Sequence, residues 1–207
     1  MRTLSSRSFR NTDATPTTWK SRASRCSTCP GRFEPETWRP LTSELTIRPA
    51  RRDDLPRLVE IYNHHVEQSV STFDTRPTSV DDRLAWFGAF SETGPYRLFV
   101  ASDGDRVLGC ASSSPYRSHP AFAKTVEVGV YLDPAVLGQG IGSALYAVLF
   151  GALLKEDIHV ALAGIALQND ASVALHRKFG FRDVGVFHEY AIKNGRYIDS
   201  LWMERRF

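Results

Sequence analysis

The chain has 207 residues, 42% of them hydrophobic, which is enough for one well-formed core and too few for two full domains. The longest apolar run, residues 141–154, is interrupted by two glycines and a serine and is too short to span a membrane. The net charge is +3, yet the charges within residues 45–207 nearly cancel and no basic face with interleaved aromatics occurs there, so we expect no nucleic-acid partner.

Residues 1–44 are rich in Ser, Thr and Arg and have little apolar periodicity, which predicts a flexible extension ahead of one domain at 45–207. A transit peptide would also be Arg-rich, but the amphipathic periodicity is poor, which favours a tail or a start codon chosen too far upstream. Cys26 and Cys29 have metal or redox spacing, but no second pair or nearby His completes a zinc site, so no metal is expected. With Cys110 they are too few for a disulfide framework, which favours a reducing, cytoplasmic compartment.

The first elements of the domain are a short strand at 45–48 and an amphipathic helix with Pro56 in its first turn, capped by a preceding aspartate. His64 and His65 on this helix point about 100° apart. They do not converge on one metal, and polar surface is the better interpretation. Five residues recur at helical spacing and should face the core: Leu55, Leu58, Val59, Tyr62 and Val66.

A loop, a second helix and a β-hairpin follow. Phe73 in the loop has no periodic partner, so it is either a core plug or a wall of a substrate pocket. The expected segments are the loop at 69–77, a helix at 80–90 after the capping pair Ser79 and Asp82, and strands at 97–101 and 107–112 around an Asp103-Gly104 turn.

The stretch from 126 to 145 carries the strongest chemical signal. β-branched and aromatic residues at 126–132 predict a strand, and Gly138, Gly140 and Gly142 precede a long apolar helix starting at about residue 140. Glycines let consecutive N–H groups approach one anion, and the helix N-terminus adds its own unpaired N–H groups, so a diphosphate ligand is predicted. A dinucleotide fingerprint would need glycine at Ser143 and a P-loop would need Gly-Lys-Ser/Thr, so both fail.

The remaining elements complete an α/β fold with a sheet of mixed direction and helices on both faces. They are a helix to residue 156, a strand at 159–166, a helix at 172–178 capped near Asn169, and strands at 182–187 and 197–203 joined by a tight Asn194-Gly195 turn.

The glycine loop resembles that of the GNAT superfamily of acetyl-CoA-dependent N-acetyltransferases, whose pattern is Gln/Arg-x-x-Gly-x-Gly/Ala. Here the pattern falls on residues 137–142, with Leu137 where the family has Gln or Arg. The family holds the diphosphate mostly through backbone N–H groups, so this departure implies weaker cofactor binding. An ordinary Gly-rich connection is the alternative for the loop alone.

Further fragments are similar to the phosphinothricin and methionine sulfoximine acetyltransferase branch, and the resemblance covers residues 45–207. It implies a GNAT-type mixed, mostly antiparallel central sheet of about six to seven strands with helices on both faces. The fragments are residues 61–64, 71–73, 126–127, 130–132, 172–176 and 195–199.

The resemblance implies acetyl-CoA as co-substrate and places its binding on the strand, the loop and the following helices. Asn169 at the start of a helix matches a cofactor-contacting Asn, although capping that helix is an alternative role. The implied cofactor-binding residues are Val130, Tyr131, Leu132, Leu137, Gly138, Gln139, Gly140, Ile141, Gly142 and Asn169.

Glu127 is the candidate general base. It interrupts an apolar strand, where a carboxylate is costly without a function or a partner, and by resemblance it occupies the branch's general-base position. A solvent-facing Glu at a strand edge is the alternative. His176 is by resemblance the candidate acid for the leaving thiolate: many relatives carry Tyr at this place and this branch has His, whose imidazole can exchange protons at cellular pH. A structural His is the alternative.

The acceptor is implied to bind at Tyr116, Arg117 and Ser118, the branch's substrate loop, with Phe73 walling the same pocket. A guanidinium can pair bidentately with a carboxylate or phosphinate, although a solvated Arg is the alternative. The predicted activity is therefore acetyl transfer to the α-amine of a small amino-acid analogue, by a cytoplasmic enzyme expected to form a homodimer. Acetylation of a peptide amine and a catalytically idle CoA-binding module are the alternatives.

Overall fold

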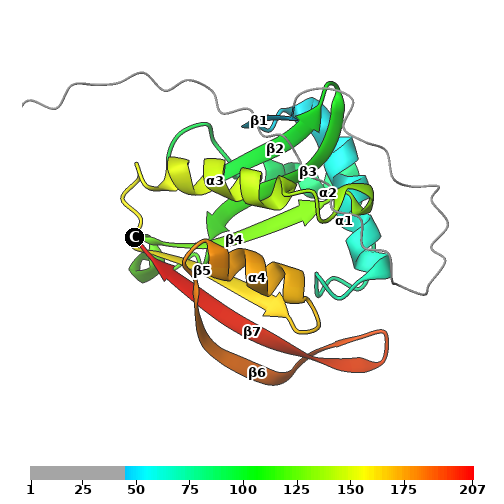
Figure 1. Ribbon diagram of the computed structural model, residues 1–207, viewed down its shortest axis with the longest axis vertical. Helices are drawn as coiled ribbons and strands as arrows, with labels where there is room; N and C mark the ends of the chain where they lie inside the picture. Colours follow the sequence, from blue (N-terminus) through cyan, green and yellow to red (C-terminus); the bar gives the residue numbers. More distant parts are fainter. Residues whose placement is uncertain (1–44) are drawn as a thin grey trace, which may run out of the picture. The chain divides into compact units, whose positions relative to one another are not determined.

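The computed structural model describes residues 45–207, so the predicted extension at 1–44, with Cys26 and Cys29, lies outside the described residues. The order of helices and strands in the described part is the one predicted (Figure 1). The helices are α1 (Leu55–Gln68), α2 (Val80–Phe87), α3 (Ile141–Leu153) and α4 (Asp170–Lys178). The strands are β1 (Leu45–Pro49), β2 (Arg97–Asp103), β3 (Arg106–Pro115), β4 (Thr125–Leu132), β5 (Val160–Ala166), β6 (Arg182–Lys193) and β7 (Arg196–Arg206).

The strands form one seven-stranded sheet in the order β1-β2-β3-β4-β5-β7-β6. Every neighbouring pair is antiparallel except β4 and β5, which are parallel. A parallel pair needs a long crossover, and α3 is part of the connection that supplies it. The predicted mixed, mostly antiparallel sheet is therefore confirmed.

Helices cover both faces of the sheet, as the alternation along β2 shows. Phe99 and Ala101 belong to the core that contains α3, whereas Leu98 and Val100 belong to a second cluster with residues of α1 and α2. Successive strand residues point to opposite faces, so α3 lies on one face and α1 and α2 lie on the other. Helix α4 shares the α3 face, since Val173 is part of the same core.

Helix α3 is the central buried element of the core. Leu145, Tyr146 and Leu149 on it have no exposed surface, and its residues are apolar on most sides. Its exposed face consists of Ala147, Val148 and Gly151. A helix this apolar is stable when most of its surface is buried, and here the sheet covers one side of it while Tyr146 contacts His176 of α4. This burial fixes the start of α3 against the end of β4, where the glycine loop lies.

The largest departure from the predicted elements is the final hairpin. Strands β6 and β7 were expected to end at residues 187 and begin at 197, but they continue up to the two-residue turn. Asn194 and Gly195 both have positive φ, the conformation of a tight hairpin turn that lets the flanking strands pair to their ends. Helices α2 and α3 end three residues earlier than expected, at Phe87 and Leu153.

Candidate active site

Strands β4 and β5 separate in the middle of the sheet. They pair over three residues only, ending at Glu127 opposite Leu162, although β4 continues to Leu132 and β5 to Ala166. On its other side β4 stays paired with β3 as far as Leu132. The edge of residues 128–132 that faces β5 is thus without a strand partner in the described structure, and its main-chain groups are available to a ligand.

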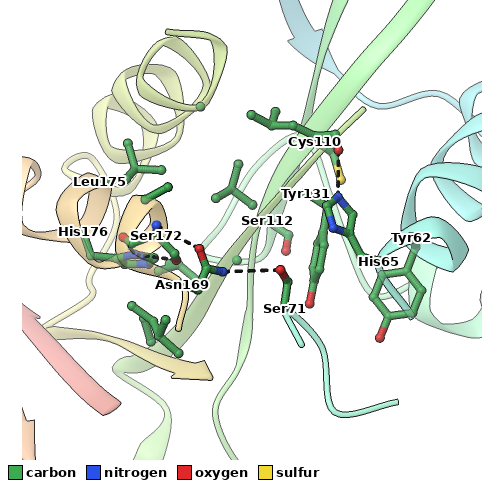
Figure 2. Close-up of a pocket in the computed structure, with 18 of the residues that line it drawn as sticks. Tyr62, His65, Ser71, Cys110, Ser112, Tyr131, Asn169, Ser172, Leu175 and His176 are labelled. Carbon is green, nitrogen blue, oxygen red and sulfur yellow. Dashed lines mark hydrogen bonds between the residues drawn. The ribbon is translucent and has the colours of Figure 1, made fainter. Parts of the chain in front are cut away.

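A cavity of about 710 Å³ opens at this separation. One part, called here the α4 side, is bounded by Val130, the glycine loop and residues of α4. The other part, called here the α1 side, is bounded by Glu127 and by residues of α1, α2 and β3. Figure 2 shows this arrangement, with Asn169 and His176 on one side and Tyr62 and His65 on the other.

The glycine loop forms the wall of the α4 side next to α3. Gly138 and Gly140 have φ values of +75° and +82°, a conformation that residues with a Cβ seldom adopt. Gly140 precedes α3 without any side-chain cap, and the first helical hydrogen bond runs from the Ala144 N–H to its carbonyl. The N–H groups of the first turn are consequently free to face an anion at the cavity.

Leu137, at the first position of the loop, lines the cavity but is 57% exposed. It offers no hydrogen-bond donor where the GNAT pattern has Gln or Arg. Gln139, predicted to contact the cofactor, does not line the cavity, and its amide Nε2 lies 3.4 Å from the Ala135 carbonyl oxygen. The loop therefore presents its backbone to the cavity and little side-chain polarity.

Glu127 lies at the point where β4 and β5 part. It is on the same side of β4 as Tyr131, whose ring packs against Tyr62 and His65 of α1, so its carboxylate faces the α1 side. Burial raises the pKa of the Glu127 carboxyl above its ordinary value. Within the described part of the chain, its carboxylate has neither a cation nor a hydrogen-bond donor as partner.

The α1 side is built from aromatic and hydroxyl groups. Ser112 and Ser114 of β3 lie opposite Gly129 and Glu127, and Tyr62 of α1 hydrogen-bonds Thr72 and Asp74 beside them. The guanidinium of Arg83 lies 3.9 Å from the centre of the Tyr62 ring. This combination suits a small polar molecule with an apolar stem.

His65 was expected on the polar surface, and this expectation is wrong. The ring is half-buried against the cavity, and its Nε2–H donates to the Leu132 carbonyl at 2.8 Å (Figure 2). Burial lowers the pKa of His65 below its ordinary value. The carbonyl lies at the end of β4, and its demand for a donor is a tertiary effect that helix periodicity does not reveal. His64 is exposed, as expected.

His176 lines the cavity but is only 3% exposed. Its Nδ1–H donates to the Ser172 carbonyl at 2.8 Å, and its Nε2 lies 2.9 Å from the Tyr146 hydroxyl. With Nδ1 protonated, Nε2 is the acceptor of the Tyr146 O–H, so both nitrogens are engaged within the protein. Burial also lowers the pKa of His176. This geometry disfavours His176 as a proton donor to a thiolate and favours its structural alternative.

Asn169 combines the two roles that the sequence left open. Its Oδ1 accepts a hydrogen bond from the Ser172 N–H at 3.2 Å, which caps α4. Its Nδ2 points across the cavity toward Ser71, at 3.4 Å from the hydroxyl oxygen (Figure 2). That contact is long, so the amide is accessible to a ligand that enters between the two sides.

All four residues predicted to bind the acceptor lie outside the cavity lining: Phe73, Tyr116, Arg117 and Ser118. Phe73 packs edge-on against Tyr190 of β6, which agrees with neither a core plug nor a wall of this cavity. Tyr116 packs on Trp202 and Arg117 lies over Tyr116, while Ser118 is exposed. Trp202 covers Gly164, a cavity residue, so the 116–118 loop stands at the rim.

Several residues that line the cavity were not predicted from the sequence. Ser143 and Lys178 lie at the α4 side, and neither belongs to the glycine pattern or to a charge run. The residues missed on the α1 side come from separate segments, so no local pattern marks them. They are Tyr62, Ser71, Arg83, Trp86, Cys110 and Ser112.

Comparison with known proteins identifies the family to which the chain belongs. Residues 58–181 match the Acetyltransferase (GNAT) family. The chain is 50% identical over 168 residues to a phosphinothricin N-acetyltransferase of Streptomyces coelicolor, covering 80% of this chain and 98% of that protein. It is 36% identical over 160 residues to an L-methionine sulfoximine/L-methionine sulfone acetyltransferase of Salmonella typhimurium, covering 77% and 93%.

Among solved structures, the chain resembles a GNAT superfamily phosphinothricin acetyltransferase from Sinorhizobium meliloti in complex with acetyl-CoA. The TM-score is 0.75 at 32% identity, with 79% of this chain and 88% of that chain covered. A sheet that splays beside a glycine loop is thus the fold of a coenzyme-A-dependent acyltransferase. The chain belongs to the acetyltransferase (GNAT) family and is an acetyl-CoA-dependent N-acetyltransferase.

Proposed function

We propose that this enzyme transfers the acetyl group of acetyl-CoA to the α-amine of a small amino-acid analogue of the phosphinothricin or methionine sulfoximine type. The observation that carries the proposal is the unpartnered, half-buried Glu127 carboxylate, which faces the α1 side at the point where β4 and β5 separate. The relatives named for phosphinothricin and for methionine sulfoximine support the acceptor class.

In the proposed reaction Glu127 accepts a proton from the acceptor's ammonium group, directly or through a water molecule. An α-amine has a pKa of roughly 8, so it is mostly protonated at neutral pH and needs a base. Because the pKa of Glu127 is raised, it lies closer to the pKa of the amine, which makes proton transfer easier. The neutral nitrogen then attacks the thioester carbon.

The new C–N bond forms as the carbonyl oxygen takes up negative charge, and the C–S bond then breaks. Main-chain N–H groups on the β5-facing edge of residues 128–132 are the proposed donors to that oxygen and to the pantetheine arm. The glycine loop and the first turn of α3 hold the diphosphate. After the C–N bond forms the nitrogen is cationic, and it loses a second proton to solvent as the C–S bond breaks. The thiolate takes up one proton from solvent and Glu127 returns its proton to solvent, so an ammonium group and a thioester become an amide, a thiol and one released proton.

We also propose that the enzyme is a cytoplasmic homodimer. No helix in residues 45–207 is long and apolar enough to cross a bilayer, and Cys110 is free and buried. Strand β6 supports the dimer, because it is an edge strand of 12 residues that exposes a row of large apolar side chains. These are Val184, Val186, Phe187, Tyr190 and Ile192, with Tyr197 on β7.

The activity is tested by following thiol release from acetyl-CoA with phosphinothricin, methionine sulfoximine, methionine sulfone and the free amino acids. We expect turnover with the analogues and little with an acidic or basic peptide, because the relatives named for an acceptor act on small amino-acid analogues. Acetylation of peptides alone would contradict the proposal. Coenzyme binding without turnover on any amine would instead support an idle CoA-binding module.

The dimer is tested separately by light scattering on the purified protein and on an Ile192→Lys variant. Ile192 is 58% exposed on β6, so the new charge should lower the molecular mass to that of a monomer without unfolding the domain. A wild-type protein that is already monomeric at micromolar concentration contradicts the dimer and leaves the proposed activity unaffected.

A further inference from the structure

The α4 side of the cavity carries a positive charge that the glycine pattern does not include. Lys178 is the last residue of α4 and lines the cavity. Its Nζ lies 3.0 Å from the hydroxyl oxygen of Ser143, which is in the first turn of α3 and also lines the cavity. The two residues come from different helices, and both flank the segment where the glycine loop enters α3.

The charge of Lys178 is not neutralised by the protein. In the described part of the chain Lys178 forms no ion pair with a carboxylate, and its Nζ contacts the neutral hydroxyl of Ser143. An ammonium group has three N–H donors, and Ser143 takes one of them. Of the other charged residues of the cavity lining, Arg83 and Glu127 are on the α1 side. Lys178 is therefore the cation of the α4 side among residues 45–207.

The neighbouring cation behaves differently, which makes it a built-in comparison. Arg177 precedes Lys178 on α4 but does not line the cavity, and its Nη2 lies 2.8 Å from an Asp183 carboxylate oxygen. Arg177 forms an ion pair within the protein, whereas Lys178 lines the α4 side of the cavity without an ion-pair partner among the described residues. A general excess of positive charge on α4 does not account for this difference.

The presence of Leu137 in the glycine loop suggests a role for Lys178. The loop lacks a polar side chain at its first position, and Leu137 is exposed there instead. We propose that Lys178, together with the Ser143 hydroxyl, binds a phosphate group of coenzyme A and so supplies the side-chain contact that Leu137 cannot make. The proposal rests on the coenzyme site proposed above, and the phosphate is either part of the diphosphate or the 3′-phosphate.

A Lys178→Gln variant of the full chain tests this contact. Calorimetric titration with coenzyme A should give a Kd roughly tenfold higher than that of the wild type, because a charge-assisted hydrogen bond to the phosphate is lost. The KM for acetyl-CoA should rise similarly, while kcat at saturating acetyl-CoA and the KM for the amine stay within about twofold. Raising the salt concentration should weaken coenzyme binding less in the variant than in the wild type.

Two matched variants separate binding from folding. Lys178→Arg keeps the charge and should stay within about threefold of the wild-type Kd, while Arg177→Gln removes a neighbouring charge and should leave the Kd unchanged. Far-UV circular dichroism confirms that α4 is intact in each protein. An unchanged Kd in Lys178→Gln, or an equal loss in Arg177→Gln, overturns the proposal.

Repeating the titrations with dephospho-coenzyme A, which lacks the 3′-phosphate, distinguishes the two phosphate sources. A loss in Lys178→Gln that persists with this ligand assigns the contact to the diphosphate, and a loss that disappears assigns it to the 3′-phosphate. Because binding is measured without an amine, a wild-type protein that binds coenzyme A but acetylates no amino-acid analogue would sink the proposed acceptor and leave this comparison valid.

Discussion

The two sides of the cavity are made from different material. The α4 side is formed largely by consecutive main-chain groups, from the unpaired edge of β4 through the glycine loop to the first turn of α3. The α1 side is formed by side chains from α1, α2, β3 and β4. Backbone can hold the invariant phosphates and amides of a coenzyme, whereas side chains can change with the acceptor. In the proposed enzyme, coenzyme binding therefore belongs to the α4 side, and the base and the acceptor pocket belong to the α1 side.

The sharpest way to separate the two sides is Glu127→Gln. Loss of the proposed base should lower kcat by roughly 10²–10³-fold, while the Kd for coenzyme A stays unchanged because the proposed coenzyme site is on the α4 side. In the wild type, the acid limb of kcat/KM should titrate above the ordinary pKa of a glutamate, since burial raises the pKa of Glu127, and the rate should rise with pH through that limb.

Thiol-release assays measure kcat and kcat/KM, and calorimetry measures the Kd for coenzyme A. Glu204→Gln is a suitable control, because Glu204 lies on β7 outside the cavity lining and pairs with Arg206. Unchanged turnover in Glu127→Gln would remove Glu127 as the base and erase the proposed division between the sides.

His176→Ala tests whether a polar group on the α4 side is structural. The change removes two buried hydrogen bonds and leaves a void, so the free energy of unfolding in urea should fall by roughly 2–4 kcal/mol. Turnover measured well below the melting temperature should persist. Tyr146→Phe, which removes only the hydroxyl at 2.9 Å, is the milder companion. A large loss of kcat with little loss of stability would restore His176 as an acid.

The lowered pKa of His176 should also make the stability of the protein depend on pH. Burial lowers the pKa of His176 in the folded state, so the unfolded chain binds the proton more readily. Its contribution to stability is complete above the unfolded pKa of roughly 6.5 and is lost as the pH falls toward the lower folded value. Urea titrations between pH 7.5 and pH 5 should show a steeper decline for the wild type than for His176→Ala.

Gly140→Ala probes the backbone nature of the α4 side. Its φ of +82° would cost an L-residue roughly 1–2 kcal/mol of unfolding free energy, and relief of that strain would displace the N–H groups proposed to bind the coenzyme. Gly151→Ala on α3 is the control, because it has open space around its Cβ position and a helical backbone. It should stabilise the protein by roughly 0.5–1 kcal/mol. Equal coenzyme affinity in both variants would contradict a main-chain phosphate site.

The smallest expected effect concerns Asn169, at the boundary between the sides. Asn169→Ala should cost roughly 1 kcal/mol of stability through loss of the α4 cap, while Asn169→Asp keeps a capping oxygen and should be close to wild type. Both variants lose the Nδ2 donor that now lies near Ser71. If coenzyme affinity falls only in the alanine variant, capping alone explains this residue.

This division also explains what the sequence could predict. The strand, glycines and helix of the α4 side are contiguous, so their spacing indicated an anion site before any fold was known. The element order and the mixed sheet followed from similar local patterns. On the α1 side the same kind of reasoning pointed to Glu127 but not to the residues around it, because Tyr62, Arg83 and Ser112 are brought together only by the packing of α1 and α2 on β3.

Two particular misses have tertiary causes. His65 is directed inward by the Leu132 carbonyl, which the end of β4 leaves without a strand partner. Strand β6 continues past Phe187 through an irregular stretch where Asp199 accepts from the Glu189 N–H and contacts His188. No proline or glycine marks that stretch. Both features depend on contacts with another element, Leu132 on β4 for His65 and Asp199 on β7 for β6, which local propensity does not capture.

The three-residue seam between β4 and β5 has a mechanical consequence. Strands β1 to β4 and strands β5 to β7 form two blocks whose direct ladder is short, with α3 and α4 packed across them. The pantetheine arm of a coenzyme bound in the gap would contact both blocks. Coenzyme binding should therefore hold the two blocks together and raise the melting temperature of the protein. Acceptor capture would then take place on a stiffer scaffold than the empty protein provides.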